Sequence, residues 1–388
     1  RDLRMSRGLG DVYKRQDVWL CSGQSNMQWV VNNVTNAEVE KKNANYSQIR
    51  TLNIPRRMEL SPKDTISTTW LVCSPETVGR FSGVAYFFAR KVYEETNIPI
   101  GIINSSWGGT IVETWTSLEA ANTLPQKRLD RYNKNEKLFP PTEYLTRKNK
   151  EAKRNDYPSL VYNAMIHPLL SFSIKGVLWY QGENNVGNAE PYTDWLTCMI
   201  GDWRNRWNSE LPFYIIQLPN FDSTNKTPLW AEIRDAQRKV LTVPKTHLIV
   251  TSDLGDPHDL HPRNKQEVGM RVALQVLHHE YGRPDIVSES PMFERMEING
   301  DKIIITFKNT GSGLEIRSRY GCLQGFAIAG EDKKFHWALG ELKDNRIVIW
   351  SPKVPNPVAV RYNWENNPDG NLYNKDGLPA CLFRTDNW

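Results

Sequence analysis

Short apolar runs alternate with longer amphipathic stretches through the first three quarters of the chain. Each run is nearly continuous, as expected of strands that are buried on both faces. The runs are residues 18–21, 100–104, 174–180, 213–218 and 247–251. Because loops of Gly, Ser, Asn or Asp and then helical patterns follow them, we predict five parallel strands in an α/β fold.

Apolar residues at helical spacing predict the helices between these strands. Val84, Phe88 and Val92 follow Ser82, whose side chain suits a helix N-cap. The other predicted helices cover residues 195–207, with a tryptophan stripe interpreted as core, 230–241 and the stretch beyond Asn264. Residues 120–160 are rich in Lys and have weak apolar periodicity, which predicts a helical, solvent-facing excursion.

Two changes of pattern divide the chain. Residues 1–16 are basic and lack the apolar core of a signal peptide, so we expect a non-native or disordered extension. After about Ser290, short β-rich runs punctuated by Gly, Asn and Pro predict a small all-β domain. The expected division is an extension at 1–16, an α/β domain at 17–288 and a β-rich domain at 289–388.

Composition excludes several classes of function. The formal net charge is only +5 and no basic run is interleaved with aromatics, so we expect no nucleic-acid partner. No apolar run is long enough for a membrane-spanning helix. The five cysteines are scattered without the spacing of a zinc site, and we expect neither a metal nor a cofactor.

The loops after the strands hold the candidate chemistry, because ligands of open α/β sheets bind beyond the carboxyl ends of the strands. In the first loop, Gly23 allows a tight turn that places Ser25 at a helix N-terminus, where backbone N–H groups favour a developing oxyanion. The alternative is a plain serine N-cap. Met27 replaces the last glycine of the G-x-S-x-G elbow, so the loop is not that motif.

Two further loops offer hydrogen-bond donors. Gly108 and Gly109 can bring backbone N–H groups close to a substrate. The loop with Gln181, Glu183 and Asn185 places amides directly after a buried strand, and a fixed amide is a suitable oxyanion donor. These polar residues could alternatively belong to a surface turn.

The last loop, residues 253–262, contains two histidines and three carboxylates. General-base catalysis needs an imidazole that a carboxylate holds in place, and this cluster supplies both groups. A metal site is the alternative interpretation, because His and Asp are also metal ligands. The four loops together contain a nucleophile, backbone donors, an amide donor and a base, a combination that arises by chance far less often than any one part.

The motifs GQSNM at 23–27, WGGT at 107–110, WYQGEN at 179–184 and DLHP at 259–262 resemble the sialate O-acetylesterase family of SGNH (GDSL-like) hydrolases. The stretches GFAIAG at 325–330 and GLPA at 377–380 are similar to the tail of that family. The resemblance implies a flavodoxin-like three-layer α/β/α fold with a five-stranded parallel sheet, followed by a small C-terminal all-β domain. The family usually has a β-rich region ahead of GQSN, so we expect a truncated N-terminus.

The resemblance also implies catalytic roles. Ser25 resembles the nucleophile and His261 the base. The orienting carboxylate usually lies just upstream of the base, and because His258 stands at the common D-x-x-H position, Asp259 is the first candidate and Asp256 the second. The implied mechanism uses an acetyl-serine intermediate.

For the oxyanion hole, the resemblance implies the backbone N–H of Ser25 and a backbone N–H of Gly108 or Gly109. It also implies an amide donor, which is Gln181 by alignment of the strand end, with Asn185 as the alternative.

The implied partner is an acetylated sugar or glycan, with O-acetylated sialic acid first and acetylated xylan or other hemicellulose second. Arg234 is a candidate for pairing with a sialate carboxylate, and the alternative is that it is simply an exposed arginine on a helix. Trp107 and Glu183 are the other candidates for substrate binding. A non-catalytic carbohydrate-binding protein and a metal-dependent hydrolase are the alternatives from other classes. Resemblance to exported bacterial enzymes implies a periplasmic or extracellular location.

Overall fold

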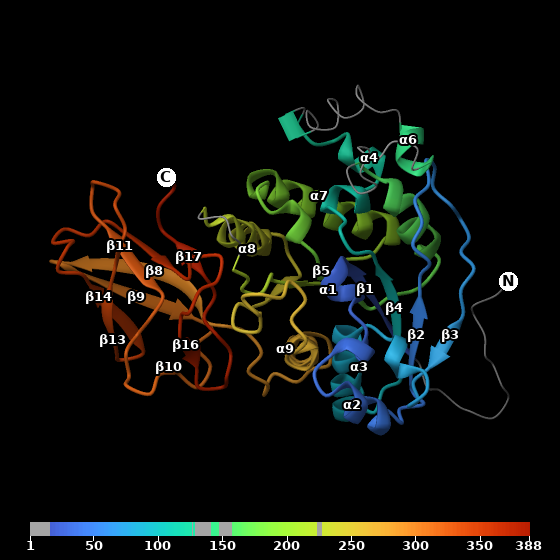
Figure 1. The fold of residues 1–388 in the computed structure, drawn as a ribbon, viewed down its shortest axis with the longest axis horizontal. Coiled ribbons are helices and arrows are strands. Elements are labelled where there is room, and N and C mark those ends of the chain that lie inside the picture. Colours follow the sequence, from blue (N-terminus) through green and yellow to red (C-terminus); the bar gives the residue numbers. More distant parts are fainter. Residues whose placement is uncertain (1–15, 126, 129–140, 147–156, 223–226) are drawn as a thin grey trace.

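The structure is a computed structural model that describes residues 16–125, 127–128, 141–146, 157–222 and 227–388. Figure 1 shows an α/β part built from the first three quarters of the chain and a separate β-rich part built from the last quarter. The expected extension at 1–16 lies outside the described residues except for Gln16.

A seven-stranded sheet forms the centre of the α/β part, in the order β3-β2-β4-β1-β5-β6-β7. Its strands are β1 (Asp17–Gly23), β2 (Ile49–Asn53), β3 (Trp70–Val72), β4 (Ile100–Ser106), β5 (Gly176–Tyr180), β6 (Phe213–Ile216) and β7 (Thr246–Ile249). Only β3 runs antiparallel to its neighbour. The five predicted strands are present as β1, β4, β5, β6 and β7, but the sheet has two strands more than predicted.

Helices cover both faces of this sheet, with α7 and α8 on one side and α3 and α9 on the other (Figure 1). The described α-helices are α1 (Ser25–Gln28), α2 (Ala37–Asn43), α3 (Gly83–Thr96), α4 (Leu118–Ala121), α6 (Pro141–Thr146), α7 (Ala189–Trp207), α8 (Leu229–Lys239) and α9 (Lys265–Glu280). The arrangement is therefore three-layered, as the resemblance implied.

Side-chain caps confirm the predicted starts of α3 and α9, whereas α7 begins at Ala189, ahead of the predicted start at 195. The Ser82 Oγ accepts a hydrogen bond from the backbone N–H of Ala85 at 3.3 Å, and Asn264 Oδ1 accepts one from Glu267 at 3.2 Å. The tryptophan stripe of α7 is core, since Trp203 is fully buried. In the predicted excursion at 120–160, α4 overlaps the start and α6 lies within it, and much of the rest is outside the described residues.

Antiparallel strands form the β-rich part in three small sheets. The strands are β8 (Met292–Asn299), β9 (Lys302–Lys308), β10 (Leu314–Ile316), β11 (Phe326–Ala329), β12 (His336–Trp337), β13 (Leu339–Lys343), β14 (Arg346–Trp350), β15 (Ala359–Tyr362), β16 (Leu372–Asn374) and β17 (Phe383–Arg384). This region has its own hydrophobic cluster, although Trp364, Cys381 and Leu382 pack into the core of the α/β part. The tail therefore completes the first core as well as forming a second one.

Among the described residues, no helix is both long enough and apolar enough to cross a bilayer.

Candidate active site

The turn between β1 and α1 places Ser25. Gly23 has φ +133°, and a Cβ on it would lie 2.1 Å from the Tyr180 carbonyl oxygen, so only glycine fits there. The chain turns at this point, and Ser25 becomes the first residue of α1 and remains partly exposed. The predicted glycine-dependent turn is confirmed.

The Gly108–Gly109 loop lies directly against this serine. A Cβ on Gly108 would be only 3.1 Å from the Ser25 Cβ. The loop can approach Ser25 this closely because Gly108 has no side chain. The Gly108 N–H donates to Gln28 Oε1 at 2.8 Å. Gln28, which sequence reasoning did not single out, is therefore the hydrogen-bond partner of this N–H in the structure.

Gln181 and Asn185 form a buried amide network. The Gln181 side chain is fully buried, and its Nε2 lies 3.2, 3.0 and 2.7 Å from Gln24 Oε1, the Thr110 carbonyl and Asn185 Oδ1. Asn185 Nδ2 donates to Glu113 Oε2 at 2.9 Å. An amide nitrogen has only two hydrogens, so this geometry does not favour Gln181 as a direct substrate donor.

Asn184 is the exposed amide of the same loop. Its Nδ2 donates to the Gly109 carbonyl at 2.6 Å, which places the side chain beside the glycine loop and leaves a second amide hydrogen. The sequence did not single out Asn184, because Asn184 and Asn185 are adjacent and the sequence alone does not show which of the two faces solvent.

Two contacts bring His261 to the helix that begins with Ser25. Asn26 Nδ2 donates to the Leu260 carbonyl at 3.1 Å, and the His261 imidazole stacks on Trp29 with ring centroids 4.9 Å apart and planes within 8°. Within the described part of the chain, His261 Nε2 is buried and has no hydrogen-bond partner. The structure thus brings the predicted nucleophile and base to one edge of the sheet.

The two candidate aspartates differ in their surroundings. Asp259 Oδ1 accepts the backbone N–H of His261 at 2.8 Å, whereas Asp256 Oδ1 accepts that of His258 at 2.8 Å. Burial and the neighbouring Lys265 ammonium lower the pKa of His261, and Asp259 opposes this shift. The charge of Asp259 acts on the imidazole, so Asp259 is a stronger candidate than Asp256 for the carboxylate beside the ring.

A buried charged cluster lies beneath these loops. Lys265 Nζ donates to Asn26 Oδ1 at 2.6 Å, and Asn26 Nδ2 donates to Glu183 Oε1 at 2.6 Å. Burial lowers the pKa of Lys265 to about 7 and raises the pKa of the Glu183 carboxyl. Lys265 was not predicted, because a lysine that follows a helix N-cap usually faces solvent.

The cluster also corrects an expectation, since the Glu183 carboxylate pairs with Asn26 inside the protein and does not face a substrate. Arg234 is a second correction. It is fully buried, and its Nη2 donates to the backbone carbonyls of Glu365 and Asn366 in the β-rich part. Arg234 therefore holds the two parts together and cannot reach a sialate carboxylate. Trp107 remains partly exposed, and its backbone N–H donates to the Gly23 carbonyl at 3.0 Å.

Known proteins are similar to this chain over most of its length. Residues 15–278 match the family model described as carbohydrate esterase, sialic acid-specific acetylesterase. The chain is 31% identical over 329 residues to the sialate O-acetylesterase of Rattus norvegicus, covering 73% of this chain and 60% of that protein. The human protein of the same name is 32% identical over 318 residues, covering 74% and 57%. The chain thus spans less than two thirds of the length of these relatives.

A solved structure supports the same relationship over nearly the whole chain. The crystal structure of a carbohydrate acetylesterase from Xanthomonas citri superposes with a TM-score of 0.86 at 37% sequence identity, and the match covers 96% of this chain and 81% of that one. This chain therefore belongs to the sialic acid-specific acetylesterase family of carbohydrate esterases.

Proposed function

We propose that this chain is a serine esterase that hydrolyses O-acetyl esters of sialic acids. The observation that supports it most directly is the Nε2 of His261, which is buried and has no hydrogen-bond partner among the described residues. The His261 ring stacks on Trp29, which directly follows the helix that Ser25 begins. A ring nitrogen in this position is available to take the serine proton. The burial that lowers the pKa of His261 favours the neutral form that a general base needs.

In the proposed reaction, the Ser25 hydroxyl oxygen attacks the acetyl carbonyl carbon while His261 takes its proton. The tetrahedral intermediate collapses, and the departing sugar oxygen receives the proton from His261. A water molecule, deprotonated by the same imidazole, then attacks the acetyl-serine, and acetate leaves as Ser25 regains its hydrogen. Asp259 orients the imidazole, and Asp256 is the second candidate for that role.

For the oxyanion we propose the backbone N–H groups of Ser25 and Gly108, with Gly109 as the alternative glycine, together with the Asn184 amide. Asn184 replaces Gln181 as the preferred amide because its side chain is exposed beside the glycine loop, whereas Gln181 is committed to buried acceptors. Each such donor contributes about 3 kcal/mol to transition-state stabilisation.

All of the groups named above are proposed to act on the acetyl ester, and none of them selects the sugar. Acetylated xylan is therefore the second candidate substrate. A non-catalytic glycan-binding role is the alternative from another class, and retention of both Ser25 and His261 argues against it. We also propose a periplasmic or extracellular location, which the glycan substrate class supports.

Acetate release from O-acetylated sialic acid and from acetylated xylan, measured side by side, tests the proposal. We expect release from the sialate ester by the wild type and background rates with Ser25→Ala. Preference for xylan would move the substrate to the second candidate. Failure of the folded wild type on both esters would contradict the esterase function. Activity that survives in EDTA would exclude a metal-dependent hydrolase.

A further inference from the structure

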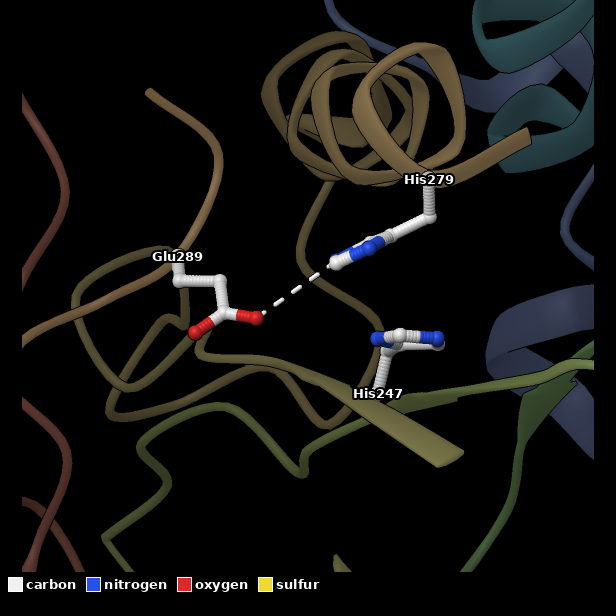
Figure 2. Close-up of side chains that lie close together, drawn as sticks. All are labelled: His247, His279 and Glu289. Atoms are coloured by element: carbon white, nitrogen blue, oxygen red, sulfur yellow. Dashed lines mark ion pairs between the residues drawn. The ribbon is translucent and has the colours of Figure 1, made fainter. Parts of the chain in front are cut away.

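Two histidines and a glutamate meet where the α/β part joins the β-rich part. His247 is the second residue of β7, His279 lies at the end of α9, and Glu289 lies in the segment between α9 and β8. Figure 2 shows the three side chains converging from these separate elements. One ligand atom of each lies within 4.8 Å of those of the other two.

We propose that His247, His279 and Glu289 bind a divalent transition-metal ion, with zinc as the first candidate, and that this ion stabilises the junction. Two imidazoles and a carboxylate are a recurrent zinc donor set, with bonds of roughly 2.0–2.2 Å. Tetrahedral coordination at such bond lengths puts donor atoms about 3.4 Å apart, so closure requires side-chain movements of roughly 1 Å.

Aromatic neighbours hold the His247 ring in place. The His247 ring stacks on Tyr214 at a centroid distance of 4.8 Å, and it lies against the His279 ring at 4.0 Å with the two planes tilted by 31°.

Glu289 is also oriented from outside the cluster. Asn309 Nδ2 donates to Glu289 Oε2, while Oε1 lies 3.5 Å from His279 Nε2. An ion pair between a histidine and a glutamate needs a proton on the imidazole nitrogen. A metal ion bound between these two atoms takes the place of that proton. An adjoining cavity of about 180 Å³, lined by His247, Glu289 and Asn309 among others, gives room for a water as a further ligand.

The position indicates a structural ion. His247 lies near the amino end of β7, whereas the catalytic loops follow the carboxyl ends of the strands. Helix α9 begins at Lys265 in the buried cluster and runs 16 residues, about 24 Å, before His279 and Glu280 end it. The ion would therefore join sheet, helix and interdomain segment without taking part in ester hydrolysis.

Zinc titration of the full, tag-free and metal-stripped chain tests this site by calorimetry and by the visible spectrum of bound Co²⁺. We expect one site per chain, tetrahedral cobalt bands and a thermal unfolding midpoint that rises with zinc. His279→Ala and Glu289→Gln should each weaken zinc by at least about a hundredfold. Asn309→Gly, which suits the observed φ of 60°, should weaken it roughly tenfold through the lost hydrogen bond.

His336→Ala, which removes an imidazole on β12 outside the cluster, is the matched control and should bind zinc like the wild type. Ser25→Ala should also bind normally, so the result does not depend on the proposed esterase activity. Absence of zinc binding by folded wild type would overturn the proposal. Zinc affinity equal to that of the wild type in both His279→Ala and Glu289→Gln would overturn it too, since the ion would then bind elsewhere.

Discussion

The burial of individual side chains determines which of the polar groups near Ser25 can contact a substrate. Gln181, Asn185 and Glu183 all follow β5, yet each is buried and bonded within the protein. Asn184, in the middle of the same turn, is exposed. Residues next to one another in the sequence thus have different roles, because the buried ones stabilise the loop and the exposed Asn184 is open to a substrate.

Asn184→Ala should lower kcat about a hundredfold without lowering the unfolding midpoint, because it removes a donor to the oxyanion from a surface position. Gln181→Ala should instead reduce the free energy of unfolding by roughly 1–3 kcal/mol, since it leaves buried acceptors unsatisfied. Steady-state kinetics and thermal unfolding of the two variants measure both effects. A fully active Asn184→Ala beside a stable, inactive Gln181→Ala would restore Gln181 as the donor.

The turn at Gly23 was predicted correctly, because the need for glycine there arises from the local backbone conformation and from the close approach of the Tyr180 carbonyl. It failed for Arg234 and Glu183 because burial depends on distant segments. Arg234 is covered by the carbonyls of residues 365 and 366, more than a hundred positions away, and no local pattern of α8 indicates that contact.

The start of α9 links the buried charged cluster to the base. Lys265 is the first residue of this helix, and it lies on Asn26, next to Ser25, while its charge acts on His261. Lys265 thus acts as a positioning residue between the loops after β1 and β7, and it favours the neutral imidazole.

Lys265→Met should move the acid limb of the kcat/KM profile to higher pH. The base must be neutral, so activity rises with pH through the His261 pKa. Burial and the Lys265 charge both lower that pKa, and removal of the charge raises it. Lys265→Arg keeps the charge and is the control, with an acid limb like that of the wild type. An unmoved acid limb in an active Lys265→Met would contradict this role.

The central strands were predictable because both faces are buried and their residues are continuously apolar, as in Val177–Tyr180 of β5. Strands β2 and β3 were not. In the β2 sequence IRTLN, charged and polar residues interrupt the apolar ones. Strand β3 at the edge has only three residues, too few for a periodic pattern. Hydrophobic periodicity therefore defines the middle of this sheet better than its edge.

The β-rich part contacts the loop after β7 and the start of α8 as well as the core. Tyr373 on β16 donates to Asp253 Oδ2 at 3.2 Å, and Asp253 forms a two-point ion pair with Arg271 of α9 at 2.7 Å. Asn366 accepts the backbone N–H of Trp230 at the start of α8 at 2.9 Å. The C-terminal region therefore helps to fix the loop that contains His261.

Asn366→Ala should reduce the free energy of unfolding by roughly 1–3 kcal/mol, because the buried Trp230 N–H would lose its acceptor. Denaturant unfolding measures this change. Asn356→Ala, at an exposed position in the same part of the chain, is the control and should stay within about 0.5 kcal/mol of the wild type. Equal stability of the two variants would contradict the proposed bracing contact.

Composition and turn residues were sufficient to predict an all-β region after about Ser290, since strand patterns there are local. The packing of Trp364 and Cys381 into the α/β core could not be predicted, because it depends on tertiary contact. The same limit applies to the cluster of His247, His279 and Glu289, whose spacing in the sequence matches no metal motif.

The central claim is that Ser25 is a nucleophile activated by His261. The most direct measurement is labelling with a fluorophosphonate probe, followed by peptide mass spectrometry of the wild type and of His261→Ala. We predict a single modified serine, Ser25, and a labelling rate in His261→Ala that is lower on the order of a thousandfold. Modification of another serine, or equal labelling rates in the two proteins, would contradict the account.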